Sequence, residues 1–391
     1  MAVALALPQA GAFEGDRVQL RASSTITYDD NLFKIAPNVT PQQVGATSRS
    51  DRIWSNLLGL RLDLPYSRQR FILDASVSDN RFAKANLLNN TGDSLLGEWD
   101  WGYMNAWTGT VQATQNRSLA SFLYLQSNLR NIISQRGLSA SADYALDARV
   151  KLQSAVGVAS YTNSADIRKP NDYYQHYLQL GAAYVTPPGN SIGGRLRVEK
   201  DSLPNYAPSL SLLEDNSFRD TTLESYFDWR LNGVSKFSGH AGLTHRDYNQ
   251  VSSRNFTGPT GRVQYDWTPN DLASVAAGIE RTLYGTMDLA SQFVVSQGLD
   301  VRAQWIPTPK IAATASLTYS KADFGGDAVT LAFQGGVQRH DTNRGFGLGV
   351  NYEMQRWAKL GLNYQFSDRS SNLSNIDFTD HTVMLNLLLS F

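Results

Sequence analysis

The residues best placed to do chemistry are charged side chains that recur at every second position along extended segments. Arginine and carboxylate residues alternate with small or apolar ones in residues 195–199 (RLRVE) and 226–230 (YFDWR). In a β-strand every second side chain points to the same face, so each segment would present its charges to one side. Guanidinium and carboxylate groups are planar, bidentate partners for polar solutes such as sugars. The pattern indicates a polar track along a wall.

The candidate track consists of charged residues on the polar faces of such segments. They are Arg61, Arg70, Glu98, Asp100, Arg195, Arg197, Glu199, Asp228, Arg230, Arg262, Asp266, Asp300 and Arg302. Those between residues 195 and 266 are expected to form a mixed-charge belt that narrows a channel. The alternative for any one of them is a structural role, in which cross-strand ion pairs hold the wall together. Because the two signs are nearly balanced, we expect weak ion selectivity.

Composition argues against several other kinds of site. The chain has no cysteine, which excludes a disulfide framework, a thiolate metal site and a cysteine nucleophile. Lys plus Arg and Asp plus Glu both number 35, so net charge gives no attraction to nucleic acid. No His-Glu-x-x-His pair or glycine-rich phosphate loop is present. We therefore expect no cofactor, no metal and no nucleic-acid partner, and we expect that the protein is not an enzyme.

The first twelve residues (MAVALALPQAGA) are small and apolar and end on Ala10-Gly11-Ala12. They resemble the end of a secretory signal peptide and its small-residue cleavage site, although the basic region that normally precedes them is missing. We interpret residues 1–12 as a signal remnant and residues 13–391 as a single domain.

Alternation with a period of two recurs from one end of the chain to the other, as in residues 58–64, 71–77 and 346–352. A soluble β-sandwich would give the same pattern. Three features favour a transmembrane β-barrel instead: short and long connectors alternate, aromatic residues gather at strand ends near the short connectors, and mid-strand charges are confined to one face. The sequence therefore predicts an all-β, antiparallel, up-and-down transmembrane barrel.

We count about 18 strands, with 16 as the alternative. The expected centres are residues 22, 58, 74, 99, 111, 139, 155, 179, 196, 226, 241, 263, 277, 300, 316, 347, 363 and 385. Residues 116–133 are ambiguous, because SLASFLYLQS could form a strand or a loop helix. Either count leaves an aqueous interior. An even number of strands places both termini on the periplasmic side.

The last strand ends the chain on an aromatic residue, with Leu385, Leu387, Leu389 and Phe391 on one face. This pattern resembles the assembly signal of bacterial outer-membrane barrels. The resemblance implies recognition by the barrel-assembly machinery, insertion into outer-membrane lipid and a location in the outer membrane of a Gram-negative bacterium.

Two further motifs resemble a family of outer-membrane β-barrel porins encoded in exopolysaccharide operons, the EpsL type. One is residues 25–33 (TITYDDNLF), and the other is residues 351–372, from NYEM to the Ser-Asn pair that precedes the last strand. The resemblance implies export of a polysaccharide, with periplasmic export components as partners. Asp29, Asp30 and Asn31 in the first motif could supply oxygen ligands to calcium, but a turn held by Asx side chains is the favoured interpretation.

The functional hypothesis is thus an outer-membrane pore for exopolysaccharide export. A general or sugar-uptake porin is the alternative. A lipid-modifying hydrolase in the barrel wall is a second alternative, which requires a serine within hydrogen-bond reach of His245 or His381.

Overall fold

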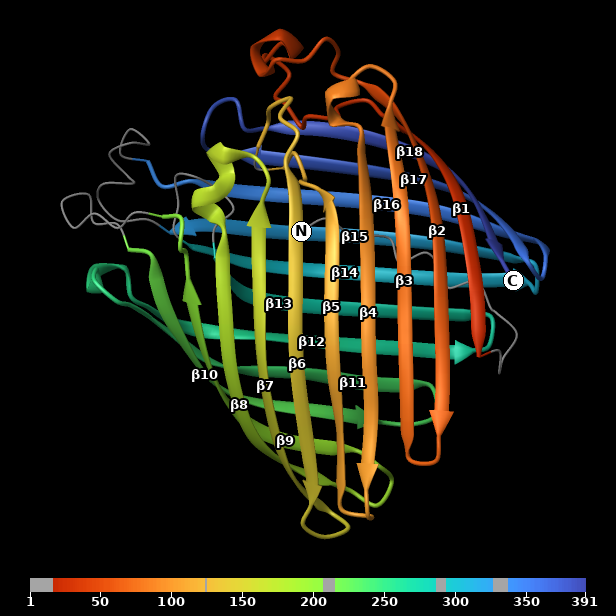
Figure 1. Ribbon diagram of the computed structural model, residues 1–391, viewed down its shortest axis with the longest axis vertical. Coiled ribbons are helices and arrows are strands. Elements are labelled where there is room, and N and C mark those ends of the chain that lie inside the picture. Colours follow the sequence, from red (N-terminus) through yellow and green to blue (C-terminus); the bar gives the residue numbers. More distant parts are fainter. Residues whose placement is uncertain (1–16, 124, 207–214, 286–292, 326–336) are drawn as a thin grey trace.

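The chain folds into 18 antiparallel strands that close on themselves (Figure 1). The computed structural model describes residues 17–123, 125–206, 215–285, 293–325 and 337–391. The strands are β1 (Val18–Asp29), β2 (Asp51–Tyr66), β3 (Gln69–Phe82), β4 (Asn90–Tyr103), β5 (Trp107–Leu119), β6 (Ile132–Ala145), β7 (Val150–Asn163), β8 (Tyr173–Val185), β9 (Ser191–Ser202), β10 (Ser217–Arg230), β11 (Ser235–Tyr248), β12 (Phe256–Asn270), β13 (Ala273–Gly285), β14 (Phe293–Thr308), β15 (Ile311–Gly325), β16 (His340–Gln355), β17 (Ala358–Ser371) and β18 (Phe378–Ser390). Short 3-10 helices lie in the loops: η1 (Pro41–Val44), η2 (Asn86–Leu88), η3 (Asp166–Asn171) and η5 (Ser252–Arg254).

Closure comes from β1, which pairs with β2 on one side and with β18 on the other. Every strand is hydrogen-bonded to its neighbour in the chain, so the sheet has no free edge. All 18 expected centres fall inside strands, and the count of 16 is wrong. The signal-remnant interpretation of residues 1–12 concerns residues outside the described part of the chain. Among the described residues, no helix is both long and apolar enough to cross a membrane.

The connectors differ in length between the two ends of the barrel, with short turns at one end and longer loops at the other. Short turns follow the even-numbered strands, as between β2 and β3, whereas longer loops follow the odd-numbered ones. In the β6–β7 turn the backbone N–H groups of Arg149 and Val150 donate to Asp147 Oδ1 at 2.7 and 2.8 Å. These two bonds favour the ionised form and hold the pKa of the Asp147 carboxyl below its usual range. Both ends of the barrel domain, at β1 and β18, lie on the short-turn side.

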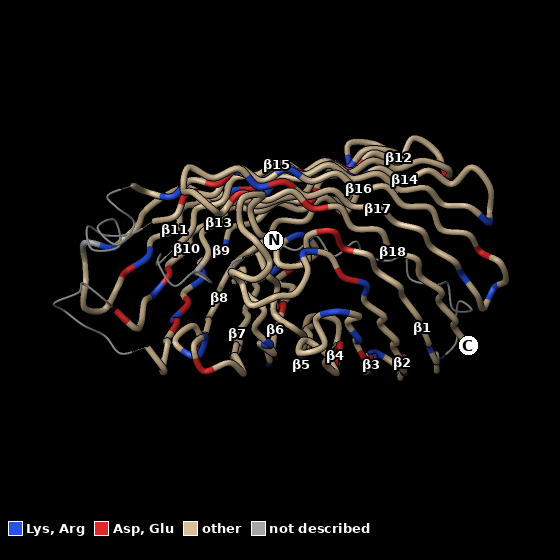
Figure 2. The backbone as a smooth tube through the Cα atoms, turned by 90° about the horizontal axis from the view of Figure 1, so that it is seen from above, with Lys and Arg blue, Asp and Glu red and all other residues tan. Residues whose placement is uncertain are grey.

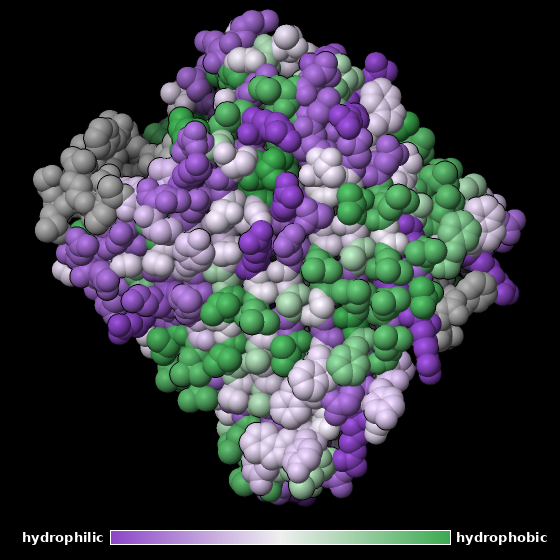
Figure 3. Space-filling view, viewed as in Figure 1, coloured by the Kyte–Doolittle hydropathy of each residue, from purple (hydrophilic) through white to green (hydrophobic). Residues whose placement is uncertain are grey.

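Many large apolar side chains are exposed on the outer surface, and they gather over the middle of the face shown in Figure 3. Large apolar side chains that are exposed on one strand lie opposite exposed apolar side chains on the next, as Ile26 does opposite Trp54. Eight residues separate Tyr184, near a short turn, from His176, the first outward ionisable side chain on β8. That is about 26 Å along a strand, or roughly 20 Å along the normal at a tilt of ~40°. This height is somewhat less than the ~25 Å apolar band of outer-membrane barrels.

The two walls of the barrel enclose an interior in which chain segments lie (Figure 2). Residues 120–131, which we call the mouth loop, connect β5 to β6 and are neither strand nor helix where they are described. Phe122 of this loop packs edge-on against Phe33 at a centroid distance of 5.0 Å. Both belong to a buried apolar cluster with Leu32, Ile35 and Leu88. The loops of the long-loop end therefore form a small core of their own.

The C-terminal phenylalanine lies on the outer surface, where its side chain is stacked on Trp357 and remains 61% exposed. Its backbone N–H and C=O both bond to Leu20, at 2.8 Å each, and these bonds do not depend on the side chain. Burial of one such ring contributes no more than about 1.5–3 kcal/mol, which is little for 18 strands.

We therefore expect Phe391→Ala to reduce the amount of barrel that reaches the outer membrane while inserted molecules keep their resistance to heat on gels. Quantitative blots of outer-membrane fractions would measure the first and semi-native gels the second. Wild-type amounts in the membrane would show that Phe391 is only part of the surface band and not an assembly signal.

Candidate functional site

The mouth loop and the inner wall opposite it enclose a cavity of about 290 Å³. Ser121 and Leu123 of the loop form one side, and residues of β13 to β18 form the other. The wall includes two glycines, Gly298 and Gly345, at which a side chain would press against Tyr319 O and Thr318 Oγ1. The loop is fixed across the mouth because Arg369 Nη1 on β17 donates to Leu123 O at 2.7 Å.

A network of four charged residues lies along this wall on β12, β13 and β14. Arg262 Nη1 bonds to Glu280 Oε2 at 2.9 Å, and Arg262 Nη2 bonds to Asp300 Oδ1 at 2.7 Å. The three side chains are between 13% and 25% exposed. Arg302 approaches the second oxygen of Asp300 at 3.9 Å. Three of these four residues were predicted from the sequence, and the network joins them to one another through Glu280.

Arg302 differs from the other members of the network because its guanidinium is largely free to act on a solute. Its side chain is 58% exposed, and it lines the cavity together with Asp300 and Glu280. Arg262 already neutralises much of the charge on those two carboxylates. A solute in the cavity would therefore meet Arg302 as the accessible cation, with hydroxyl, amide and carboxylate groups around it.

The predicted belt between residues 195 and 266 is divided by the structure into separate groups. Arg195 Nε bonds to Glu224, a residue on β10 that was not predicted. Arg197 Nε bonds to Glu199 Oε2 at 3.0 Å, and its guanidinium lies 3.9 Å from the centre of the Tyr177 ring. These contacts hold both arginines against the wall.

Other members of the belt lie closer to the short-turn end. Lys236 Nζ bonds to Asp228 at 2.6 Å, and Gln264 donates to Asp266 at 2.8 Å. Arg230 belongs to the last residue pair of the β10–β11 ladder, opposite Lys236. The structure thus places Asp228 and Arg230 at one end of the barrel, whereas Asp266 is linked to Arg262 through Gln264, which accepts from Arg262 Nη2 at 3.4 Å.

The remaining predicted residues lie on β2, β3 and β4. Arg61 Nη1 lies 3.5 Å from Asp74 Oδ2. Arg70 makes a bidentate bond with Asp63, at 2.8 and 2.6 Å. Glu98 accepts a bond from Gln112 at 2.8 Å, and Asp100 accepts one from Thr110 at 2.8 Å. Alternation in the sequence was sufficient to find these side chains, but it could not show which of them are already paired.

Buried charges near the long-loop end were missed altogether. Arg246, whose side chain is 3% exposed, makes a bidentate bond with Asp220 at 2.7 and 2.6 Å. Arg339 bonds to Asp341 in the same way. Alternation would have placed Asp220, Arg246 and Asp341 on the inner face. Their burial follows from the loops that cover them, and the sequence gives no signal for that.

The Asp-Asp-Asn motif after β1 anchors the first long loop. Asn31 is buried, and its amide donates to Ile35 O and Thr379 O at 2.9 Å each, while its carbonyl oxygen accepts from Ile35 N at 3.1 Å. Asp29 Oδ1 accepts from Asn31 N at 2.9 Å, which is the Asx turn favoured by the sequence. The motif thus has a structural function that does not depend on the solute.

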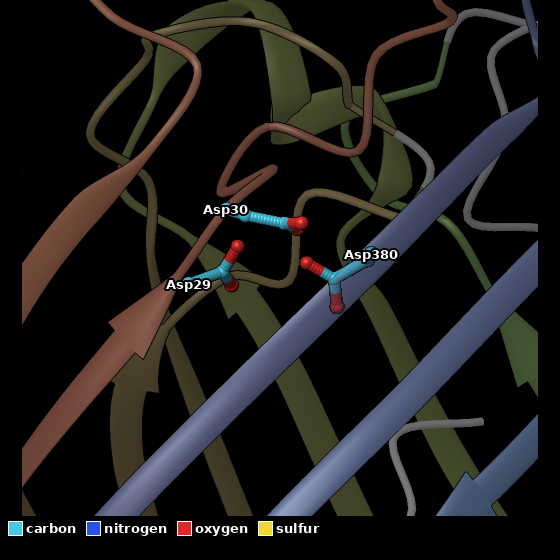
Figure 4. Close-up of side chains that lie close together, drawn as sticks. All are labelled: Asp29, Asp30 and Asp380. Atoms are coloured by element: carbon cyan, nitrogen blue, oxygen red, sulfur yellow. The ribbon is translucent and has the colours of Figure 1, made fainter.

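Three carboxylates converge beside this anchor, from Asp29, Asp30 and Asp380 on β18 (Figure 4). The ammonium group of Lys34 bonds to Asp29 Oδ2 at 2.9 Å and to Asp380 Oδ2 at 2.7 Å. Asp30 Oδ1 accepts from the His381 N–H at 2.7 Å. A lysine side chain of the protein itself therefore supplies the cation that balances this cluster.

The hydrolase alternative requires a serine bonded to His245 or His381, and among the described residues neither histidine bonds to a serine. His245 bonds to Thr257 Oγ1 at 2.6 Å and to Asp247 Oδ1 at 3.0 Å, and His381 bonds to the Tyr364 hydroxyl at 2.8 Å. Residues 189–193 (GNSIG) match the Gly-x-Ser-x-Gly pattern of serine hydrolases. They form a β-hairpin turn and not the strand–turn–helix of that motif, and no described histidine bonds to the serine.

Comparisons with known proteins give a partial family match and a clear match in fold. A model of the family described as "Putative beta-barrel porin 2" matches residues 234–391. No curated protein sequence matches the chain. Among solved structures, OccK1 (OpdK) of Pseudomonas aeruginosa is 11% identical with a TM-score of 0.53, and the alignment covers 96% of this chain and 99% of that one. OccK2 (OpdF) of the same organism, solved in complex with glucuronate, is 12% identical with a TM-score of 0.53 over 97% and 99% of the two chains.

The chain has the fold of a porin barrel, and its location is the Gram-negative outer membrane. Its fold class, location and strand count are as predicted, and a match to porins agrees with the expectation that the chain is not an enzyme. The family match supports the predicted resemblance at the level of a β-barrel porin. Nothing in it refers to exopolysaccharide operons, so that part of the resemblance stays a prediction.

Proposed function

We propose that this barrel is an uptake porin for small polar solutes that carry a carboxylate, such as sugar acids. The observation that carries the proposal is the cavity beneath the mouth loop, with the exposed guanidinium of Arg302 on its wall. An exposed arginine can hold a carboxylate by two parallel N–H···O bonds. The hydroxyl and amide groups of Thr318, Asn343 and Gln365, which also line the cavity, suit sugar hydroxyls.

The ligands of two similar solved structures agree with this choice of solute. OpdK was solved with vanillate and OccK2 with glucuronate, and both ligands are small carboxylates. These names describe those proteins. For this chain they support uptake over export of a polymer.

The volume of the cavity beneath the mouth loop also favours a small solute. A cavity of about 290 Å³ is at the lower end of the range for sites that hold one small molecule. An exopolysaccharide would have to displace the mouth loop, which Phe122, Asn128 and the contact to Arg369 hold in place. Export, with its periplasmic components, therefore becomes the second candidate, and its only support is the resemblance of the two sequence motifs.

The test is solute flux through the purified barrel in liposomes. We expect glucuronate to enter faster than neutral glucose, and Arg302→Gln to abolish that preference without slowing glucose, because one charge-assisted bidentate contact is worth roughly tenfold in affinity. Arg70→Gln, whose guanidinium is already paired to Asp63, is the matched control. Equal fluxes of glucuronate and glucose in the wild type would refute the proposal, and passage of a long polysaccharide would favour export.

A further inference from the structure

A row of three basic side chains crosses the outer surface of β8, β9 and β10. His176 lies directly opposite Lys200, and Lys200 lies directly opposite Arg219. All three residues are exposed. Alternation places them on the same face as the exposed apolar side chains Leu178 and Leu196, which belong to the outer band. We call these three residues the cationic row.

The cationic row lies where the apolar band ends. His176 is eight residues from Tyr184 at the short-turn end, which is the full height of the band. Directly below the row on neighbouring strands come apolar side chains, with Leu178 opposite Val198 and then Leu180 opposite Leu196. The row therefore faces the boundary between acyl chains and headgroups in the leaflet on the long-loop side.

Placing like charges directly opposite one another, as Lys200 and Arg219 are, destabilises a sheet. Among the described residues, no carboxylate forms an ion pair with Lys200 or Arg219. The acid that lies opposite Arg219, Asp247, is held by His245 Nε2 and Asn255 Nδ2, each at 3.0 Å.

Two outward arginines on other strands have a carboxylate partner within the barrel. Arg81 on β3 bonds to Asp79 at 2.8 Å, and Arg117 on β5 lies 3.5 Å from Asp93 on β4. In both cases the barrel itself supplies the counter-ion. Lys200 and Arg219 of the cationic row, in contrast, form no ion pair with a carboxylate of the described residues.

We propose that the cationic row binds the phosphate of an outer-leaflet lipid whose acyl chains lie on the apolar strip below. Lysine and arginine donate charge-assisted hydrogen bonds to phosphate oxygens, and an anion between them removes the repulsion within the row. His176 adds a third donor at the end of the row. The site lies on the outside of the barrel and is independent of which solute passes through the lumen.

The experiment measures binding of bisphosphorylated lipid A to the detergent-purified barrel by native mass spectrometry. We expect the double variant Lys200→Gln with Arg219→Gln to bind this lipid roughly 30-fold more weakly, from the typical gain per basic residue near an anionic lipid surface. Arg81→Gln removes an outward charge that is already paired with Asp79, so this variant should bind the lipid as the wild type does. Dephosphorylated lipid A should bind the wild type and the double variant equally weakly.

Two results would overturn the proposal: equal binding of the phosphorylated lipid to the wild type and the double variant, or equal binding of both lipids to the wild type. If the double variant does not insert, Arg219→Gln alone tests the same contact with an expected loss of roughly fivefold. A heat-modifiable band on gels would establish that either variant is folded.

Discussion

Replacing residues 121–130 of the mouth loop with a short glycine-serine linker should raise single-channel conductance roughly twofold or more, because conduction follows the narrowest part of a pore. The loop crosses the mouth from β5 and reaches Arg369 on β17, and it encloses the cavity against the inner wall. The barrel ladders do not use the loop, so the variant should still fold. Planar-bilayer recordings would give the conductance, and flux of larger sugars would give the change in size limit.

A matched control shortens a loop at the same end of the barrel that does not line the cavity. Residues 166–170, within η3, are suitable, because neither they nor their neighbours line the cavity beneath the mouth loop. Conductance should not change in this control. A folded variant without the mouth loop that conducts as the wild type does would show that another part of the lumen is the narrowest.

Arg262→Gln should make the pore clearly selective for cations. The arginine bonds to Glu280 and Asp300, so its removal subtracts one positive charge and also leaves two carboxylates without their main partner. A unit charge within about 4 Å of a hydrated ion changes its energy by ~1 kcal/mol, so we expect the cation-to-anion permeability ratio to rise roughly fivefold. The barrel should remain stable, because partly solvated ion pairs contribute little to stability.

Reversal potentials in a salt gradient would measure this change, and two comparisons make the result specific. Arg70→Gln removes one cation from a half-exposed pair near the short-turn end and should shift selectivity much less. Adding Glu280→Gln to Arg262→Gln should reduce the cation preference, because it removes one of the two freed carboxylates. An unchanged permeability ratio would mean that permeating ions do not pass near this network.

The sequence by itself determined the barrel and the residues of its lining. Side chains alternate strictly in a strand, and a wall between lipid and water requires opposite chemistry on its two faces, so each strand could be found from its own residues. Arg195, Arg262 and Arg302 were found in this way, and so was the Asx turn at Asp29. Glu280 follows the same rule and could have been found with them.

Only the tertiary structure decided which charges are free and where the mouth loop lies. Arg262 and Arg302 have the same place in the alternating pattern, yet one is neutralised by residues on two neighbouring strands and the other is open to the cavity. The mouth loop was ambiguous because its residues make no periodic pattern, and its position depends on contacts to Phe33 and Arg369, which are distant in sequence. The cationic row likewise exists only once the register brings three separate strands side by side. Period-two alternation is a local property, whereas ion pairing, loop packing and cross-strand neighbours depend on the register and closure of the whole sheet.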